Sequence, residues 1–405
     1  MRFGDGPTDA LRTPLSKPLL VVSCVALCAA CLDEPSDPGA TGRAEAVDLF
    51  SEWPGDESLR IAAEPGLVVG SDESLPLGRV SGAVFFGDGI AVADVQSYEV
   101  LVLDAAGRLL YRHGRKGEGP GEYMNLASIA RHADGLVTWD AYHLRVTRLD
   151  ASGGYIEQTK HTLVGPYLMS RIVGAFGNGV LLESWEMGWR GSSPAGPMEI
   201  RLPVTYDIVR LSDGVVVFEG TRPGEEQWAA REVKADGRLR DGGTPVTFGR
   251  TAVSAVTDRY AYLADTDSIT ITRYDEAGTV VEVSFEQPRE SAEADWVRFV
   301  SDTLRANPFI SELGLRLLED LPARSTLPAF SAMMGGADGL LWIREYPDPL
   351  QDQVVWVGFS EAWERKKRIT MPVSLNVLDI SEDRVLVQAK GAHDEDLIEV
   401  YPIER

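Results

Sequence analysis

A short polar turn followed by a β-rich run recurs along the chain, and this repeat constrains the fold more than any other feature. The turns begin at Asp88, Asp134, Asn178, Asp258, Asp338 and Asp383. By subtraction, successive turns start 46, 44, 80, 80 and 45 residues apart. A period in the forties is typical of the blades of a radial β-propeller, and each of the two longer spacings equals one period plus an insertion. The repeat therefore predicts an all-β fold, a six-bladed β-propeller.

Each repeat reads as two strands around a turn. Asp88–Asp94 leads to Val100–Leu103, and Asp134–Asp140 leads in the same way to Leu149. The strands are β-branched and aromatic, and we expect the Asp-Gly steps to supply the positive φ of tight hairpins. An apolar stretch such as Ala127–Ile129 precedes each turn and is the expected inner strand.

Strand-forming residues also appear early in the chain, over Leu59–Gly70, while the final repeat ends at Ile403. A propeller must close its ring, and an N-terminal strand that completes the C-terminal blade removes an exposed sheet edge. We expect the early strand to pair with the final repeat.

Composition fits one large folded domain. Hydrophobic residues make up 44% and charged residues 25% of the 405 positions, as in soluble proteins with a substantial core. The formal net charge is −23. Nucleic-acid binding needs a basic stripe, and the longest basic run, Arg365–Arg368, lies beside Glu361 and Glu364. We therefore expect no nucleic-acid partner.

The N-terminus has the order of an export signal. Arg12 and Lys17 precede an apolar run, Leu19–Ala30, which ends in small residues before Cys31. A run of about a dozen apolar residues is too short for a permanent membrane span. Residues 1–30 are predicted to be a signal peptide, with a plain secretory signal or an N-terminal membrane anchor as the alternatives.

The end of this segment, Ala29-Ala30-Cys31, resembles the lipobox of bacterial lipoproteins, with Cys28 in place of the usual Leu. The resemblance implies that Cys31 carries a lipid and begins the mature chain, which then has no disulfide because Cys24 and Cys28 are removed. Residues 31–57 are rich in Asp, Glu, Pro, Gly, Ala and Ser and are predicted to be a flexible tether. Residues 58–405 are the predicted propeller.

The second insertion, about residues 287–328, changes to helical periodicity. Trp296, Phe299, Val300 and Leu304 recur at helical spacing, and a second helix carrying Leu313, Leu317 and Leu318 follows Asn307-Pro308. The sequence predicts a helical insertion between blades 4 and 5, with its apolar stripe packed on the blades.

Several features together resemble the six-bladed β-propeller lipoproteins of bacterial envelopes, relatives of the NHL-repeat propellers. They are the run Gly114–Tyr123, the element Val92–Asp94, the helical insertion and the lipobox. The resemblance implies an exported protein, lipid-anchored to a membrane of the cell envelope. That group mostly lacks an assigned reaction. Better-known six-bladed relatives are metal-dependent lactone hydrolases of the gluconolactonase type, metal-dependent peptide-amidating lyases and interaction modules.

The glycine-rich run Gly114–Tyr123 is not a phosphate-binding loop, because neither Gly-Lys-Ser/Thr nor a helix follows it. It joins the outer strand of one blade to the inner strand of the next. We interpret it as a structural connection in which Gly and Pro allow a tight return toward the axis.

Blade-to-blade connections share one face of a propeller with the turns between second and third strands, and we call this the loop face. Binding sites in propellers usually use such a surface or the mouth of the channel. The residues predicted to contact a ligand there are Arg79, Asn125, Arg171, Arg250, Trp185 and Trp189. The two indoles have an alternative role as caps on the edge of the blade.

Catalytic motifs are few. The five histidines form no His-x-x-x-His or Glu-x-x-His group, and no Gly-x-Ser-x-Gly motif occurs. Asp94, Asp140 and Asp265 on the loop face, joined by Asn125 or Asn376, form a candidate calcium site near the axis. The alternative is that each aspartate caps its own turn.

Two functions remain open from the sequence. One is a lipid-anchored, non-catalytic scaffold that presents its loop face to a peptide, glycan or envelope protein. The other is a metal-dependent hydrolase or lyase with acidic ligands at the central channel. Convergence of Asp94, Asp140 and Asp265 at the axis favours the enzyme, and their separation as turn caps favours the scaffold.

Overall fold

The computed structural model describes residues 20–21, 49–53, 57–71, 75–133, 135–161, 169–185, 196–233, 236–237, 239–285, 290–307 and 310–405. Within these ranges the chain forms 27 strands and 2 helices. The predicted lipidation residue Cys31 lies outside the described residues, as does most of the predicted signal peptide. The described pair in that segment, β1 (Leu20–Val21), lies parallel to β20. No helix in the described part of the chain has the length and apolarity needed to cross a membrane.

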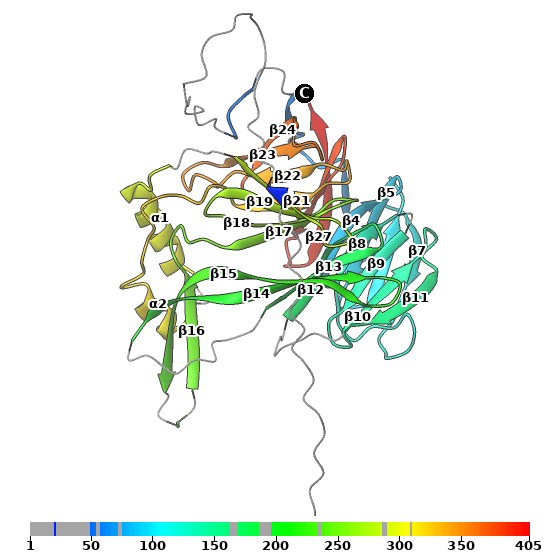
Figure 1. The fold of residues 1–405 in the computed structure, drawn as a ribbon, viewed down its shortest axis with the longest axis horizontal. Coiled ribbons are helices and arrows are strands. Elements are labelled where there is room, and N and C mark those ends of the chain that lie inside the picture. The colour runs from blue at the N-terminus through cyan, green and yellow to red at the C-terminus, as the bar shows by residue number, and fades with distance from the viewer. Residues whose placement is uncertain are drawn as a thin grey trace, which may run out of the picture.

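The first half of the chain folds into consecutive antiparallel sheets (Figure 1). Their strands are β4 (Val80–Phe86), β5 (Gly89–Asp94), β6 (Glu99–Leu103) and β7 (Leu109–His113); β8 (Leu126–His132), β9 (Gly135–Asp140), β10 (Arg145–Leu149) and β11 (Tyr155–Lys160); β12 (Met169–Phe176), β13 (Gly179–Trp185), β14 (Met198–Arg210), β15 (Val216–Val233) and β16 (Leu239–Pro245).

The second half continues this pattern. Its strands are β17 (Ala252–Val256), β18 (Ala261–Asp265), β19 (Ile269–Tyr274) and β20 (Val280–Phe285); β21 (Ala332–Gly335), β22 (Leu341–Arg344), β23 (Gln353–Phe359) and β24 (Arg365–Pro372); β25 (Asn376–Ile380), β26 (Arg384–Lys390) and β27 (Asp396–Glu404). Each polar turn of the sequence repeat falls between the first and second strands of a sheet, although Asp134 itself lies outside the described residues.

The first strands of the sheets form a closed ring. β4, β8, β12, β17, β21 and β25 each contact the next strand in this order, and β25 contacts β4. Apolar clusters fill the spaces between successive sheets, and one of them joins β26 and β27 to the sheet that begins with β4. The core is therefore a series of layers between sheets rather than one central mass.

This arrangement explains the continuous apolar runs of the repeat. Every residue of β5 is buried, because each of its faces packs against a different neighbour. Ile90 and Val92 join the cluster with the last sheet, whereas Ala91 and Ala93 join the cluster with the next one. A strand buried on both faces shows no polar alternation.

The Asp338-Gly339 step supplies positive φ as predicted, with a φ of 77° at Gly339, whereas the Asp-Gly steps of the first two hairpins have a different role. The positive φ in the first hairpin belongs to Gly87 and that in the second to Ala133. Gly89 and Gly135 are required for space, because a Cβ atom would lie 1.9 Å from the Leu103 carbonyl oxygen and 2.1 Å from the Leu149 carbonyl oxygen, respectively. The repeat thus records close packing of the second strand on the third.

The N-terminal strands close the ring. β3 (Leu67–Val69) pairs antiparallel with β27, as expected for an early strand that completes the final repeat. β2 (Glu57–Ile61) lies between β24, to which it is parallel, and β27, to which it is antiparallel, and so joins the last two antiparallel runs into one sheet.

The tether prediction was wrong for Leu49–Trp53. Leu49 and Phe50 are 1% and 5% exposed in a cluster that also contains Tyr262 and Phe359. Two basic side chains of β24 hold the backbone here, since Arg365 donates to the Leu49 carbonyl at 2.8 Å and Arg368 donates to the Phe50 carbonyl at 3.2 Å. Leu49 and Phe50, with Trp53 packed beside them, bury enough apolar surface to hold this short segment on the propeller.

Two helices lie between β20 and β21, α1 (Ala294–Arg305) and α2 (Glu312–Leu317). Leu313 and Leu317 of α2 pack on Trp228 and Ala230 of β15. The predicted packing of α1 was wrong, because no residue of α1 is buried and Phe299 is 46% exposed. Figure 1 shows both helices and β16 on one side of the molecule, away from β7 and β11.

Candidate ligand-binding site on the loop face

Two of the predicted ligand-binding residues line one pocket. Arg79 directly precedes β4 and Asn125 directly precedes β8. Between them lies the turn from β5 to β6, which carries Gln96 and Tyr98. These four residues, with Val95 and Met124, line a pocket of about 500 Å³. The pocket lies at the end of the sheets where the chain passes from one sheet to the next.

Two buried aspartates place the residues of this pocket. Asp94, which is 3% exposed, accepts hydrogen bonds from the Arg79 N–H at 2.9 Å and the Gln96 N–H at 2.9 Å. Asp140, which is fully buried, accepts in the same way from the Asn125 N–H at 3.2 Å. Each carboxylate therefore fixes the start of its first strand, and with it the pocket residue found there.

The glycine-rich loop forms the side of the site. Arg145 donates to the Glu118 carbonyl at 2.9 Å and also to the Glu122 carbonyl. The Glu122 carboxylate accepts from the Gly119 N–H at 2.8 Å and pairs with Arg115. These contacts make the loop an ordered connection, as its structural interpretation predicts.

The loop also brings a cation close to Tyr98, one of the residues that line the pocket. Lys116 Nζ lies 5.6 Å from the centre of the Tyr98 ring. Beneath the loop, the Tyr123 hydroxyl is hydrogen-bonded to Thr138 Oγ1 at 2.9 Å, and burial raises the pKa of Tyr123 to about 12. The Gly119 N–H and the Arg115 guanidinium lower the pKa of Glu122, so this carboxylate stays charged in its structural role.

The polar side chains of the pocket have no internal partners. Among the described residues, no hydrogen bond or ion pair involves the side chains of Arg79, Gln96 or Asn125, and the ammonium of Lys116 contacts only the Tyr98 ring. Arg79 and Gln96 are exposed and Asn125 is half-buried. The pocket lining offers one cation and two amides to a ligand, Lys116 adds a second cation beside the Tyr98 ring, and no carboxylate is among the described lining residues.

The central channel is different in chemistry. A cavity of about 320 Å³ is lined by residues of all the first strands, including Arg131, Arg171 and Asp379. Arg131 of β8 pairs with Asp379 of β25. Burial raises the pKa of Asp379, while Arg131 and the Phe85 N–H act in the opposite direction. This pair connects sheets that are not neighbours in the ring.

Arg171 lies in the channel rather than in the pocket and is already paired. Its guanidinium is 3.0 Å from Glu183 Oε2, which also accepts from Ser254 Oγ at 2.9 Å. Both arginines of the channel are thus compensated by carboxylates of the chain.

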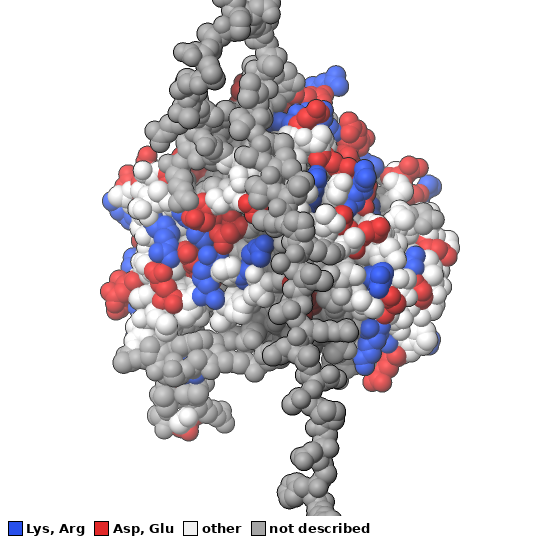
Figure 2. Space-filling model, in the orientation of Figure 1, with Lys and Arg blue, Asp and Glu red and all other residues white. Residues whose placement is uncertain are grey.

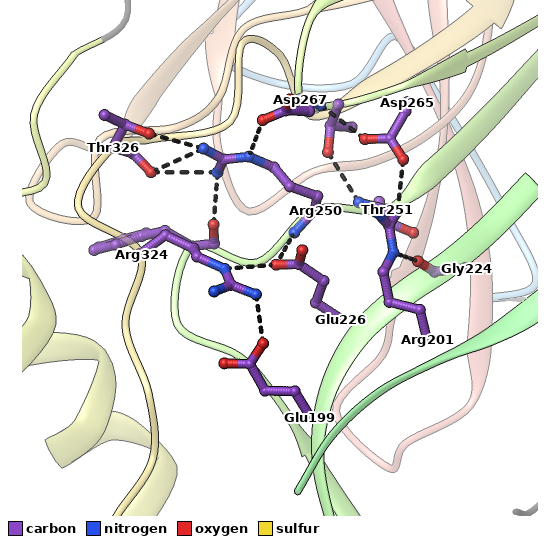
Figure 3. A network of polar contacts seen from close by, with 12 residues as sticks. Glu199, Arg201, Gly224, Glu226, Arg250, Thr251, Asp265, Asp267, Arg324 and Thr326 are labelled. Carbon is purple, nitrogen blue, oxygen red and sulfur yellow. Dashed lines mark hydrogen bonds and ion pairs between the residues drawn. The ribbon is translucent and has the colours of Figure 1, made fainter.

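The prediction for Arg250 was wrong, as Figure 3 shows. Its side chain is 7% exposed, and the guanidinium donates to Asp267 Oδ1 at 3.0 Å and to Thr326 Oγ1 at 2.9 Å. Nearby, Arg324 bridges Glu226 of β15 and Glu199 of β14. The network holds the long β14–β15 hairpin against the segment after α2. The insertion that contains this hairpin therefore contacts the helical insertion. Arg250 is held within the network and is not available to a ligand.

The three aspartates do not converge, and the arrangement agrees with the alternative in which each aspartate caps its own turn. Asp94 and Asp140 cap separate turns, and Asp265 accepts from the Asp267 N–H at 2.9 Å and pairs with Arg201 at 2.6 Å. No group of three or more His, Cys, Asp or Glu side chains within the described ranges has the geometry to hold a metal ion. The carboxylates stabilise turns because an aspartate at a strand end finds free backbone N–H groups there.

The predicted tryptophans are only partly placed. Trp185 is half-buried at the end of β13, opposite Val204 of β14, and Trp189 lies outside the described residues.

Sequence reasoning did not assign Gln96 and Lys116 to the site. The register of the repeat could have found Gln96, because it follows Asp94 by two positions. The approach of Lys116 depends on the path of the loop, for which the sequence carries no signal.

Charges of both signs are mixed on the molecular surface. Figure 2 shows Lys and Arg side chains lying among Asp and Glu side chains on the described part of one face, without a continuous basic stripe. Arg365 and Arg368 of the longest basic run are directed to the backbone of the N-terminal segment.

A closed ring of antiparallel sheets, each starting at the axis, defines a β-propeller. A family model described as "6-bladed beta-propeller" matches residues 70–170 and confirms the predicted resemblance to such propellers over that part of the chain.

Solved structures with this architecture are similar only at low identity. A member of the DUF4221 family from Bacteroides vulgatus is 10% identical over 86% of this chain and 99% of its own, with a TM-score of 0.43. An exported protein of Bacteroides fragilis, so described, is 11% identical over 88% of this chain and 97% of its own, with a TM-score of 0.42. A comparison with curated protein sequences gave no match.

Proposed function

We propose that this chain is an exported, lipid-anchored binding protein of a bacterial cell envelope. In this proposal residues 1–30 are a signal peptide, Cys31 carries the lipid, and the propeller has six blades with the helical insertion between blades 4 and 5. The order charged, apolar, small and Cys at the N-terminus supports export and lipidation. The ring of β4, β8, β12, β17, β21 and β25 supports the blade number.

The loop face binds the partner, which is a peptide, glycan or envelope protein. The pocket of Arg79, Gln96, Tyr98 and Asn125 is the single observation that carries this proposal, because its polar side chains have no partner among the described residues. Side chains with unsatisfied hydrogen-bonding groups at the edge of a rigid scaffold are typical of recognition sites.

Binding fits the site better than catalysis does. The carboxylates nearest the pocket, Asp94 and Asp140, accept hydrogen bonds from backbone N–H groups and hold turns. A general base or a calcium ligand needs a carboxylate free to face the substrate or the ion.

Lipidation is tested with the full chain expressed in a bacterium and fractionated. We expect the protein in the membrane fraction, and an N-terminal peptide whose mass includes a lipid on Cys31. The variant Cys31→Ser should lose both properties, whereas Cys24→Ser should keep them. Equal membrane association of Cys31→Ser and the native chain would instead indicate a transmembrane anchor.

Binding is tested by screening the mature chain without its lipid against arrays of glycans and peptides. We expect hits that the double variant Arg79→Ala, Asn125→Ala loses. The matched control is Arg112→Ala on the outer strand β7, where the arginine pairs with Glu99 at 3.1 Å. Hits that survive the double variant would place the binding surface elsewhere.

A further inference from the structure

We propose that the loop-face pocket takes a carboxylated sugar, the uronic-acid unit of an acidic glycan. This inference rests on the proposed function of the same site and names its ligand class. The carboxylate is bound by Arg79 and Lys116, the ring hydroxyls by Gln96 and Asn125, and the sugar ring lies against Tyr98.

The first argument for this ligand is the positive charge at the pocket. Arg79 and Lys116 stand beside one pocket without an ion-pair partner among the described residues, while the arginines of the channel are paired with Asp379 and Glu183. Unpaired cations that flank a cavity favour an anion, and a guanidinium binds a carboxylate through two parallel hydrogen bonds.

The size of the negative charge on the ligand is limited by the rest of the chain. The net charge of −23 repels a densely charged polyanion at long range. A ligand with one carboxylate per ring experiences the local cations and less of this repulsion, because exposed charges farther apart than about 10 Å are screened at 0.1 M salt.

The second argument for this ligand is the kind of hydrogen-bonding group that the pocket leaves available. Much of its backbone is already used, since the N–H groups of Arg79, Gln96 and Asn125 bind Asp94 or Asp140. The carbonyls of Arg79 and Asn125 accept from the Val95 and Ala141 N–H groups. A peptide backbone needs free main-chain partners, so recognition here falls to side chains. Two carboxamides suit the paired hydroxyls of a sugar, because each presents a donor beside an acceptor.

The third argument for this ligand is the size and shape of the pocket. The pocket of about 500 Å³ has the volume of a small-molecule site. Tyr98 is half-buried and lines the pocket. The π face of an aromatic ring is negative and attracts the positive C–H groups of a sugar ring.

The experiment uses tetragalacturonate and its fully methyl-esterified form, which keeps every ring and removes every charge. Titration calorimetry with the mature, unlipidated chain should show binding of the acid and at least tenfold weaker binding of the ester. Arg79→Ala should weaken binding of the acid at least tenfold and leave the weak binding of the ester unchanged. Arg79→Lys should lie between, because an ammonium does not form the two-bond fork. Arg112→Ala is the control, and unchanged thermal midpoints show that the variants fold.

Each outcome of these measurements either supports or overturns one part of the proposal. Equal affinity for the acid and its ester would overturn the carboxylate assignment while the loop face still binds glycans. Binding of tetraglutamate but not of tetragalacturonate would overturn the sugar assignment. If the mature chain bound nothing in the array screen, the proposed function itself would be overturned. Affinity for the acid that does not change in Arg79→Ala would move the site away from this pocket.

Discussion

The channel and the loop-face pocket both contain arginine, yet the two regions treat it in opposite ways. In the channel, Arg131 lies beside Asp379, whose side chain is 2% exposed, and the pair joins sheets across the axis. At the pocket, Arg79 is exposed and has no partner among the described residues. A buried charge must be compensated by the chain itself, whereas an exposed charge is free for a ligand. The comparison separates side chains that hold the ring from side chains that serve recognition.

The largest expected effect comes from breaking the channel pair. Arg131→Ala leaves Asp379 buried without its cation, and removal of one partner of a buried pair costs about 3–5 kcal/mol. Arg79→Ala, at an exposed position, should change the free energy of unfolding by less than about 0.5 kcal/mol. Both are measured by urea denaturation of the mature chain. Equal effects of the two substitutions would remove the distinction between the regions.

The next effect concerns the support beneath the pocket. Burial raises the pKa of Tyr123 to about 12, against about 10 in an unfolded chain. Between these values the unfolded state releases its proton first. Stability is therefore complete below pH 10 and falls as the pH rises toward 12, by roughly 2–3 kcal/mol.

Tyr123→Phe should reduce the alkaline loss by the contribution of Tyr123 and leave the part due to Tyr111, Tyr206 and Tyr401, whose pKa values burial also raises. The substitution should cost about 1 kcal/mol at pH 7 through the lost hydrogen bond to Thr138. The measurement is the free energy of unfolding at several pH values between 8 and 12. The control is Tyr155→Phe, whose ring is 42% exposed. An alkaline slope that Tyr123→Phe leaves unchanged would assign the loss to another group.

A smaller effect is expected from the second channel arginine. The Arg171 side chain is 52% exposed and Glu183 is 15% exposed, so water screens the pair. Arg171→Ala should cost about 0–1 kcal/mol, the usual range for an exposed ion pair. The same denaturation series checks it. A loss as large as that of Arg131→Ala would show that the whole channel is one coupled network.

No effect is expected from metal removal. Asp94, Asp140 and Asp265 are occupied by separate turns, so a strong chelator should leave the thermal midpoint unchanged. A ligand that binds only the folded state raises its stability, so a midpoint that falls with chelator and recovers with calcium would revive the metal-dependent enzyme.

The fold was more predictable than the site, for a physical reason. The period of the repeat reports a polar turn between the first and second strands of each sheet, and in the first two sheets it also reports the close packing at Gly89 and Gly135. The order of strands and the return of β3 to β27 follow from that period and from the need to close the ring. These are properties of local sequence and of symmetry.

The rest depends on contacts between distant segments. Arg79 and Arg250 both lie within two residues of the start of a first strand, and only the path of the later insertion decides that Arg250 is covered by Thr326. The apolar stripe of α1 matches that of a buried helix, although its neighbours leave it without a buried residue. Arg79 and Asn125 were found because both occupy the same register position of the repeat.

The contact of Leu49–Trp53 with the propeller shows at which end of the sheets the N-terminal part of the chain arrives. β2 runs parallel to β24, so the chain enters the propeller at the end of β24 where Arg365 lies, opposite the end that bears the pocket. If Cys31 holds the lipid, only 17 residues separate it from Leu49, and even fully extended they reach about 60 Å. The attachment then lies within about 60 Å of the propeller and on the end of the sheets opposite the pocket, so the tether does not cover the pocket.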